Sequence, residues 1–175
     1  MKQMKNNIVL IGMPGVGKST IGVILAKILG YRFVDADLLI QEREGKLLKE
    51  IIAEQGIDGF VRIENDVNAS IQCEKTVIAT GGSVVYGTEA MEHLKEIATV
   101  VYLELELPAL KRRLGNLKKR GVVLKENQTL AGLYAERVPL YKKYADITVN
   151  EHRKTIEKTI ETLVDVLEEE YGVDV

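Results

Sequence analysis

Residues 12 to 19 of this chain read Gly12-Met13-Pro14-Gly15-Val16-Gly17-Lys18-Ser19. The stretch satisfies the pattern G-x-x-x-x-G-K-[ST] at every fixed position, which is the signature of a phosphate-binding loop, or P-loop. Its flanks also fit, because an apolar run at residues 8–11 precedes it and a helical pattern at residues 19–29 follows it. The stretch therefore predicts a protein that binds a nucleoside triphosphate, expected to be ATP, together with Mg²⁺.

The fixed positions of this loop have distinct chemical tasks. Glycines let successive backbone N–H groups point at phosphate oxygens, next to the positive end of a helix. Lys18 is expected to reach the β and γ phosphates and to act in catalysis, and the Ser19 hydroxyl is expected to ligate Mg²⁺. The alternative, a glycine-rich turn that binds nothing, is disfavoured by the full match. The predicted nucleotide-binding residues of the loop are Gly12, Gly15, Val16, Gly17, Lys18, Ser19 and Thr20.

Strand and helix patterns alternate along the rest of the chain. Strands are predicted at residues 8–11, 31–34, 76–79, 99–103 and 147–149. Helices are predicted at residues 19–29, 38–54, 59–72, 89–95, 108–117 and 155–170, and an acidic loop at residues 35–37. Such alternation implies right-handed crossovers and a parallel sheet with helices on both faces. We expect one α/β domain of three layers over residues 1–175, with ligands beyond the carboxyl ends of the strands.

Composition narrows the possible partners. The chain has 175 residues, a formal net charge of −2 and one cysteine, Cys73, so neither a strong field for nucleic acid nor a disulfide framework is expected. No apolar stretch approaches the roughly 20 residues of a membrane span, and the start of the chain does not resemble a signal peptide. We expect a cytoplasmic monomer without nucleic-acid or membrane partners. His93 and His152 are expected to be surface residues.

After the P-loop, the sequence resembles the shikimate kinases, within the nucleoside-monophosphate-kinase-like group, over residues 7 to about 163. The family pattern F-x-D-x-D occurs here as Phe33-Val34-Asp35-Ala36-Asp37. The resemblance implies that Asp35 helps to hold Mg²⁺, and that Asp37 binds the acceptor hydroxyl and is its candidate general base. Alternate residues at a strand end point in different directions, so the two carboxylates can serve different ligands. An ordinary acidic loop is the alternative interpretation.

A second family pattern, I-F-x-x-x-G-E-x-x-F-R-x-x-E, is only partly matched. Ile57 replaces the Glu that follows the glycine of this pattern, and Val61 replaces the arginine, which binds the shikimate carboxylate in the family. Arg62 is a weak candidate for the missing contact, because one helical step turns a side chain by about 100°. The resemblance implies an acceptor-binding segment at about residues 35–64. The positions that match are Gly56, Phe60 and Glu64.

Two further stretches bear on the acceptor. The third strand is followed by Thr80-Gly81-Gly82-Ser83, where the family has three glycines, so Gly82 is expected to meet the acceptor and Ser83 is a further change. A plain turn is the alternative. The stretch Glu136-Arg137-Val138-Pro139-Leu140-Tyr141 resembles the family's R-x-P-L-Y, which implies that Arg137 holds the acceptor carboxylate.

The chain has a basic stretch from Lys111 to Arg120. Residues 113–123 resemble the family's lid, R-(x)6-R-P-L-L, with Gly121 in place of the proline. The resemblance implies a lid at about residues 113–128, in which Arg113 stacks on adenine and Arg120 contacts the phosphates and acts in catalysis. A solvated helix face and a weak nucleic-acid patch are the alternatives. Residues 150–154 fall where the family completes its adenine pocket.

Three functions follow from these patterns. The favoured one is shikimate kinase, which makes shikimate 3-phosphate and ADP in chorismate and aromatic amino-acid biosynthesis. The second is a kinase of the same fold for another polyol or hydroxy acid, suggested by Ile57, Val61 and Ser83. The third is a non-catalytic nucleotide-binding module, which the retained Lys18 and Asp37 argue against, because a module that only binds needs no acceptor base.

Overall fold

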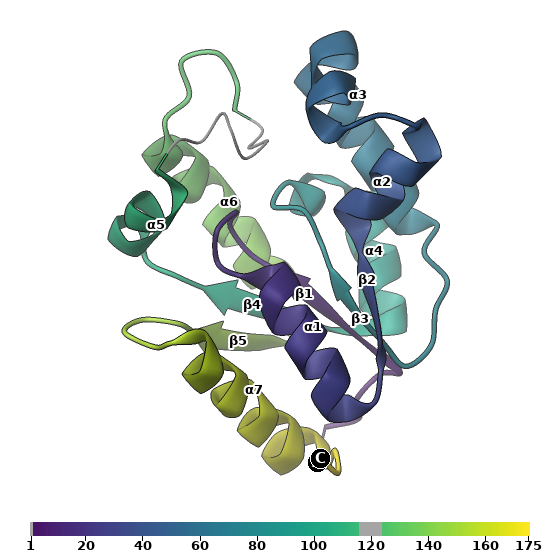
Figure 1. The fold of residues 1–175 in the computed structure, drawn as a ribbon, viewed down its shortest axis with the longest axis vertical. Helices are drawn as coiled ribbons and strands as arrows, with labels where there is room; N and C mark the ends of the chain where they lie inside the picture. Colours follow the sequence, from purple (N-terminus) through teal and green to yellow (C-terminus); the bar gives the residue numbers. More distant parts are fainter. Residues whose placement is uncertain (1, 116–123) are drawn as a thin grey trace.

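The computed structural model describes residues 2–115 and 124–175 (Figure 1). Within these residues, one sheet contains β1 (Asn7–Ile11), β2 (Arg32–Asp35), β3 (Thr76–Ala79), β4 (Ala98–Glu104) and β5 (Ile147–Asn150). All strand pairs are parallel, and the order across the sheet is β2-β3-β1-β4-β5. The helices are α1 (Lys18–Leu29), α2 (Ala36–Glu44), α3 (Leu48–Ala69), α4 (Thr88–Ile97), α5 (Leu107–Leu114), α6 (Leu130–Tyr144) and α7 (Ile156–Tyr171), with a short 3-10 turn η1 (Val84–Tyr86).

The centre of the sheet is β1, which is buried along its whole length. Val9 pairs in register with Ile78 of β3 on one side and with Val100 of β4 on the other. These strands are continuous apolar runs because both faces of the sheet are covered by helices. Helices α1 and α7 cover one face, and α4 and α6 cover the other (Figure 1). The predicted three-layer α/β/α fold with a parallel sheet is therefore confirmed.

The strand order places the P-loop at a special point of the sheet. From β1 the chain moves to one side for β2 and β3, and then to the other side for β4 and β5. Crevices that bind ligands form where the direction changes, beyond the carboxyl ends of the strands. The loop after β1 lies at this point, so the sheet topology itself directs a ligand toward residues 12–19.

The predicted acidic loop at residues 35–37 is wrong. Asp35 ends β2 and is at the same time the N-cap of α2, because its Oδ1 accepts a 2.9 Å hydrogen bond from the Asp37 backbone N–H. Aspartate is among the best N-cap residues, and its side chain satisfies a backbone donor that the first helical turn leaves open. Asp37 therefore lies in the first turn of a helix, which fixes its direction.

Two other helical predictions need correction. The predicted helix at 38–54 is divided, since α2 ends before Gly45, which adopts a left-handed conformation (φ 65°). Helix α3 then begins at Leu48 and is kinked at Gly56, whose backbone angles (φ 71°, ψ 179°) are not helical. Helix α6 was not predicted, because Pro139 interrupts its pattern.

No helix in residues 2–115 or 124–175 is both long and apolar enough to cross a membrane.

Candidate active site

The P-loop connects the buried end of β1 to the first turn of α1. Gly12 (φ 149°) and Gly17 (φ 93°) adopt backbone conformations that side chains disfavour. A Cβ atom on Gly12 would also lie 2.7 Å from the Leu103 carbonyl oxygen of β4, so the loop can pass over the sheet only with glycine there. The predicted curl of the loop is therefore present, and it points the start of α1 into the crevice.

Lys18 is the first residue of α1 and its side chain is 8% exposed. Its ammonium donates hydrogen bonds to the carbonyl oxygens of Gly12 (2.7 Å) and Met13 (2.9 Å), which keeps it against the loop. Burial lowers the pKa of Lys18 to about 8, and the negative charge of Asp37 opposes this shift. The cation is thus held against the P-loop, beside the pocket that this loop lines.

Ser19 and Asp35 form an oxygen pair at the edge of the loop. The Ser19 hydroxyl donates to Asp35 Oδ2 at 2.8 Å, which joins α1 to the end of β2. Mg²⁺ prefers hard oxygen ligands and usually takes only one or two from the protein, completing its shell with water and phosphate oxygens. A hydroxyl and a carboxylate at this distance fit that requirement, and no cluster of three or more His, Cys, Asp or Glu side chains competes with it among the described residues.

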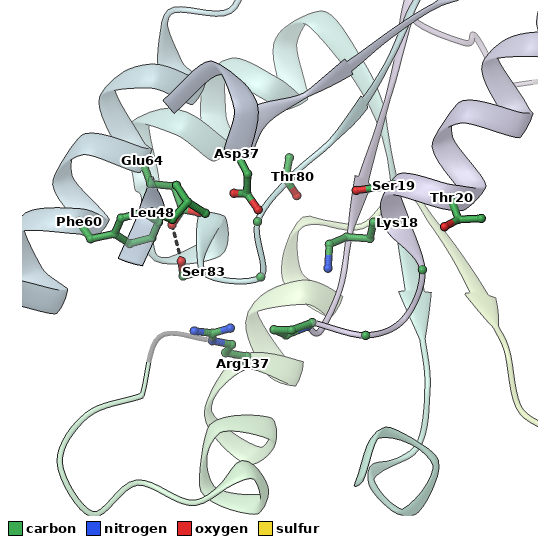
Figure 2. Close-up of a pocket in the computed structure, with 15 residues that line it drawn as sticks. Lys18, Ser19, Thr20, Asp37, Leu48, Phe60, Glu64, Thr80, Ser83 and Arg137 are labelled. Atoms are coloured by element: carbon green, nitrogen blue, oxygen red, sulfur yellow. Dashed lines mark hydrogen bonds between the residues drawn. The ribbon is translucent and has the colours of Figure 1, made fainter. Parts of the chain in front are cut away.

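A pocket of about 240 Å³ extends from the P-loop to α3 and α6 (Figure 2). In Figure 2, Lys18, Asp37 and Arg137 approach it from three sides, from α1, α2 and α6. The turn after β3 and helix α3 form the remaining wall. Residues far apart in the sequence therefore meet in one cavity beside the loop. The predicted site residues that line it are Gly15, Gly17, Lys18, Ser19, Thr20, Asp37, Gly82 and Arg137.

Two carboxyl groups in this pocket have raised pKa values. Burial raises the pKa of Asp37 to about 6, with a further contribution from Asp35, while Lys18 opposes the shift. Burial raises the pKa of Glu64 to about 7, although the hydroxyl of Ser83 donates to its Oε1 at 2.5 Å and thereby favours the ionised form. Perturbed carboxyl groups in a cleft are common at functional sites.

The turn after β3 is tightly enclosed. A Cβ atom on Gly82 would lie 2.8 Å from Arg137 Nη1 and from a ring carbon of Pro14, and one on Gly81 would lie 2.8 Å from Asp37 Oδ1. A side chain at either position would therefore have to displace groups that line the pocket. The hydroxyl of Tyr141 donates to the Gly82 carbonyl oxygen at 2.5 Å, which ties the turn to α6.

Arg137 lies on α6 and is 1% exposed. Its Nε donates to the hydroxyl of Tyr86 at 3.3 Å, and its guanidinium lies 5.3 Å from the centroid of the Tyr86 ring. An arginine held by an aromatic ring keeps a defined orientation and can bind a carboxylate in two-point fashion. Arg137 therefore lines the pocket in a fixed orientation, and its contact with an anionic acceptor stays a prediction.

Not all predicted residues meet in this pocket. Arg62 is exposed on α3, and its Nη2 lies near Gly59 of the same helix rather than among the pocket residues. Arg113 is half-buried at the end of α5, and its Nη1 donates to the carbonyl oxygens of Gly15 (3.3 Å) and Val16 (3.5 Å). It therefore lies against the nucleotide loop. Arg120 lies outside the described residues, as does much of the predicted lid.

Sequence reasoning missed several residues of this region. Glu64 was matched to a family pattern without a role, and Ser83 was noted only as a change. The partner of Ser83 is 19 positions away, so no local pattern indicated their contact. Tyr86 gave no signal, because a single tyrosine after a turn is an ordinary core residue. His152 is exposed, whereas His93 is partly buried and its ring contacts the Ile71 carbonyl oxygen at 2.6 Å.

A parallel sheet between two layers of helices, together with this loop and the pocket beside it, defines a P-loop kinase of the nucleoside-monophosphate-kinase-like class. The family model for shikimate kinase matches residues 14–168. The chain belongs to the shikimate kinase family.

Relatives and solved structures agree with this assignment. The shikimate kinase of Chlorobium chlorochromatii (strain CaD3) is 38% identical over 179 residues, covering 96% of this chain and 94% of the relative. That of Clostridium botulinum (strain Eklund 17B / Type B) is 40% identical over 141 residues, covering 80% and 84%. Among solved structures, the Acinetobacter baumannii shikimate kinase in complex with shikimate has a TM-score of 0.83 at 30% identity, covering 93% of both chains. The Aquifex aeolicus enzyme has a TM-score of 0.78 at 30% identity, covering 93% of this chain and 96% of its own.

Proposed function

We propose that this protein is a shikimate kinase, which transfers the γ-phosphoryl group of ATP to a hydroxyl of shikimate and forms shikimate 3-phosphate and ADP. The observation that carries the proposal is the single pocket that joins Lys18 of the P-loop to Asp37 and Arg137. A phosphate donor and a small hydroxy acid can meet there with the charges that each requires. Family membership supports the same acceptor.

The chain's residues suit an in-line transfer. The acceptor hydroxyl oxygen forms a bond to the γ-phosphorus, the bond to the bridging oxygen of ADP breaks, and the hydroxyl proton passes to Asp37. With a pKa of about 6, this carboxyl is mostly ionised at neutral pH and can accept that proton. Lys18 neutralises charge on the phosphates, and Ser19 and Asp35 would hold Mg²⁺, which would supply further positive charge to the phosphates. Positioning and charge neutralisation are the main requirements of this chemistry.

Arg137 is proposed to bind the carboxylate of the acceptor. A fixed guanidinium pairs well with a planar carboxylate, and this one is buried beside Gly82 in the pocket wall. Val61 lines a neighbouring hollow of about 210 Å³ that Arg137 and Lys125 also line. The loss of the family's arginine at position 61 supports a second candidate, a kinase of the same fold that acts on another polyol or hydroxy acid.

Other parts of the proposal concern the surroundings of the site. We propose that Arg113 and Arg120 act on the nucleotide, and that the chain works as a cytoplasmic monomer.

The test is ADP release from Mg²⁺-ATP with shikimate, beside a panel of other polyols and hydroxy acids. We expect turnover with shikimate at micromolar to low millimolar concentration, and Arg137→Lys should raise its KM by about tenfold or more without changing the KM for ATP, because Lys lacks the two-point geometry. Arg62→Lys is a matched control on the exposed side of α3. Turnover with another panel member and none with shikimate would favour the second candidate.

A further inference from the structure

Two departures from the family pattern lie on either side of one buried carboxyl group. Val61 is one helical turn before Glu64 on α3, and Ser83 faces Glu64 from the turn after β3. Glu64 is 1% exposed and Ser83 is 4% exposed. The hydrogen bond between them is drawn in Figure 2, where both side chains form the wall opposite Lys18.

We propose that Ser83 is a positioning residue of the acceptor site, whose hydroxyl holds the Glu64 carboxylate on the pocket wall in place of a donor at position 61. The proposal rests on the proposed function, since it concerns how the acceptor is bound. It assigns a role to a residue that replaces a glycine, and it links the changes at positions 61 and 83 to each other.

A buried carboxylate requires hydrogen bonds or an opposite charge, because burial removes its contacts with water. The groups that face Glu64 come from four elements: Asp37 of α2 repels it, while Lys18 of α1 and Arg137 of α6 attract it, and Ser83 donates to it. The Ser83 hydroxyl donates a direct hydrogen bond to Oε1 of this carboxyl group. Its removal would leave a buried acceptor oxygen without that donor.

The residue at position 61 accounts for the origin of the hydrogen-bond donor to Glu64 in the turn after β3. Side chains three residues apart on a helix are neighbours on its surface, so an arginine at position 61 would be able to pair with Glu64. Val61 has no donor and contributes instead to the apolar cluster around Phe60 and Ile51. Ser83 then supplies from across the pocket the hydrogen bond that α3 itself does not.

The expected consequence is an effect on the acceptor and not on the nucleotide. Glu64 and Ser83 both line the pocket beside Arg137, whereas the P-loop lies on the opposite side (Figure 2). A displaced or protonated Glu64 would alter the acceptor wall and the charge balance around Arg137. Binding of Mg²⁺-ATP depends on the loop and would be preserved.

The experiment compares Ser83→Gly, Val61→Arg and the double variant with the wild type. Ser83→Gly should raise the KM for shikimate by about tenfold, the usual scale for losing a hydrogen bond to a charged group, while the KM for ATP changes less than about twofold. Adding Val61→Arg to Ser83→Gly should restore the shikimate KM to near the wild-type value. Ser70→Ala is the matched control, because the Ser70 hydroxyl donates to the Val67 carbonyl oxygen at the end of α3 and Ser70 is not among the residues that line the pocket.

A second readout separates positioning from general damage. Loss of the Ser83 hydrogen bond disfavours the ionised form of Glu64, so the acid limb of kcat/KM for shikimate should move to higher pH in Ser83→Gly and return in the double variant. Calorimetric binding of Mg²⁺-ATP shows whether each variant is folded, with Ser83→Ala as the milder substitute. An unchanged shikimate KM in folded Ser83→Gly, or purely additive effects in the double variant, would overturn the inference. Absence of shikimate turnover in the wild type would instead overturn the proposed function.

Discussion

The Ser19 hydroxyl and the Asp35 carboxylate are joined by a 2.8 Å hydrogen bond that links the start of α1 to the end of β2. The other oxygen of the same carboxylate caps α2 by accepting from the Asp37 backbone N–H. One side chain therefore sets both the proposed metal position and the direction of the proposed general base. This double use makes it possible to test the two tasks separately.

Asp35→Asn should separate them, because asparagine caps a helix as well as aspartate but carries no charge. We expect the Mg²⁺ concentration for half-maximal ADP release to rise by about tenfold or more, since a carboxylate ligand is lost. The thermal midpoint should change little. Asp35→Ala, which removes the cap too, should lower the midpoint as well. An unchanged Mg²⁺ dependence in Asp35→Asn would show that this carboxylate does not hold the metal.

Lys18→Met should abolish transfer while leaving the fold intact. The buried ammonium has a pKa lowered to about 8, so at neutral pH its burial costs stability that an apolar side chain of similar length does not. We therefore expect a thermal midpoint at least as high as that of the wild type, with a kcat lower by about a thousandfold or more, because charge neutralisation at the γ-phosphate is lost. Unchanged transfer by the purified variant would remove Lys18 from the mechanism.

Asp37→Asn should lower kcat by about a hundredfold to ten-thousandfold, the range over which general bases contribute. The KM for ATP should change little, because Asp37 faces the acceptor part of the pocket. Steady-state rates at varied ATP and varied shikimate distinguish the two effects. If ATP binding collapsed instead, the roles proposed for Asp35 and Asp37 would have to be exchanged.

Local sequence patterns were sufficient to predict the fold and the position of the P-loop. Each fixed position of the P-loop has a backbone or charge requirement of its own, so the pattern is recognisable without a partner elsewhere in the chain. Strand positions were also predicted closely, because the buried parallel strands are continuous apolar runs, such as residues 8–11. The cap at Asp35 was missed because an acidic pair at a strand end fits a loop equally well.

The part of the pocket wall formed by Glu64 and Ser83 could not be predicted, because the contact between them joins residues that are distant in the sequence. Ser83 and Glu64 come from different elements, and only the folded chain shows that they bond. Helical phase did predict that Arg62 would be a poor substitute for an arginine at position 61, and its exposed position agrees. Helix α6, which carries Arg137, was not predicted because Pro139 lies inside it. The role of Arg120 stays a prediction.

The buried carboxyl group of Glu151 allows a test of how burial makes the stability of the protein depend on pH. Its side chain is 1% exposed, and neither carboxyl oxygen has a hydrogen-bond partner among the described residues. Arg113 Nη1 lies 4.0 Å from Oε2, at the limit of an ion pair. Burial raises the pKa of Glu151 to about 7, and the positive charges of Arg113 and Lys18 oppose this shift.

A raised pKa in the folded state fixes the sign of the pH dependence. Between the unfolded pKa, near 4.5, and the folded value of about 7, the native state holds the proton more tightly, so this group makes the wild type lose stability as pH rises through that window. Glu151→Gln does not ionise, so its free energy of unfolding relative to the wild type should increase from pH 5 to pH 8 by about 1 to 3 kcal/mol. Urea unfolding at the two pH values measures this, with Glu169→Gln on the exposed face of α7 as the control. If the difference in free energy of unfolding between Glu151→Gln and the wild type were equal at both pH values, Arg113 would already compensate the buried charge of Glu151. The two residues would then have to be treated as one ion pair beside the P-loop.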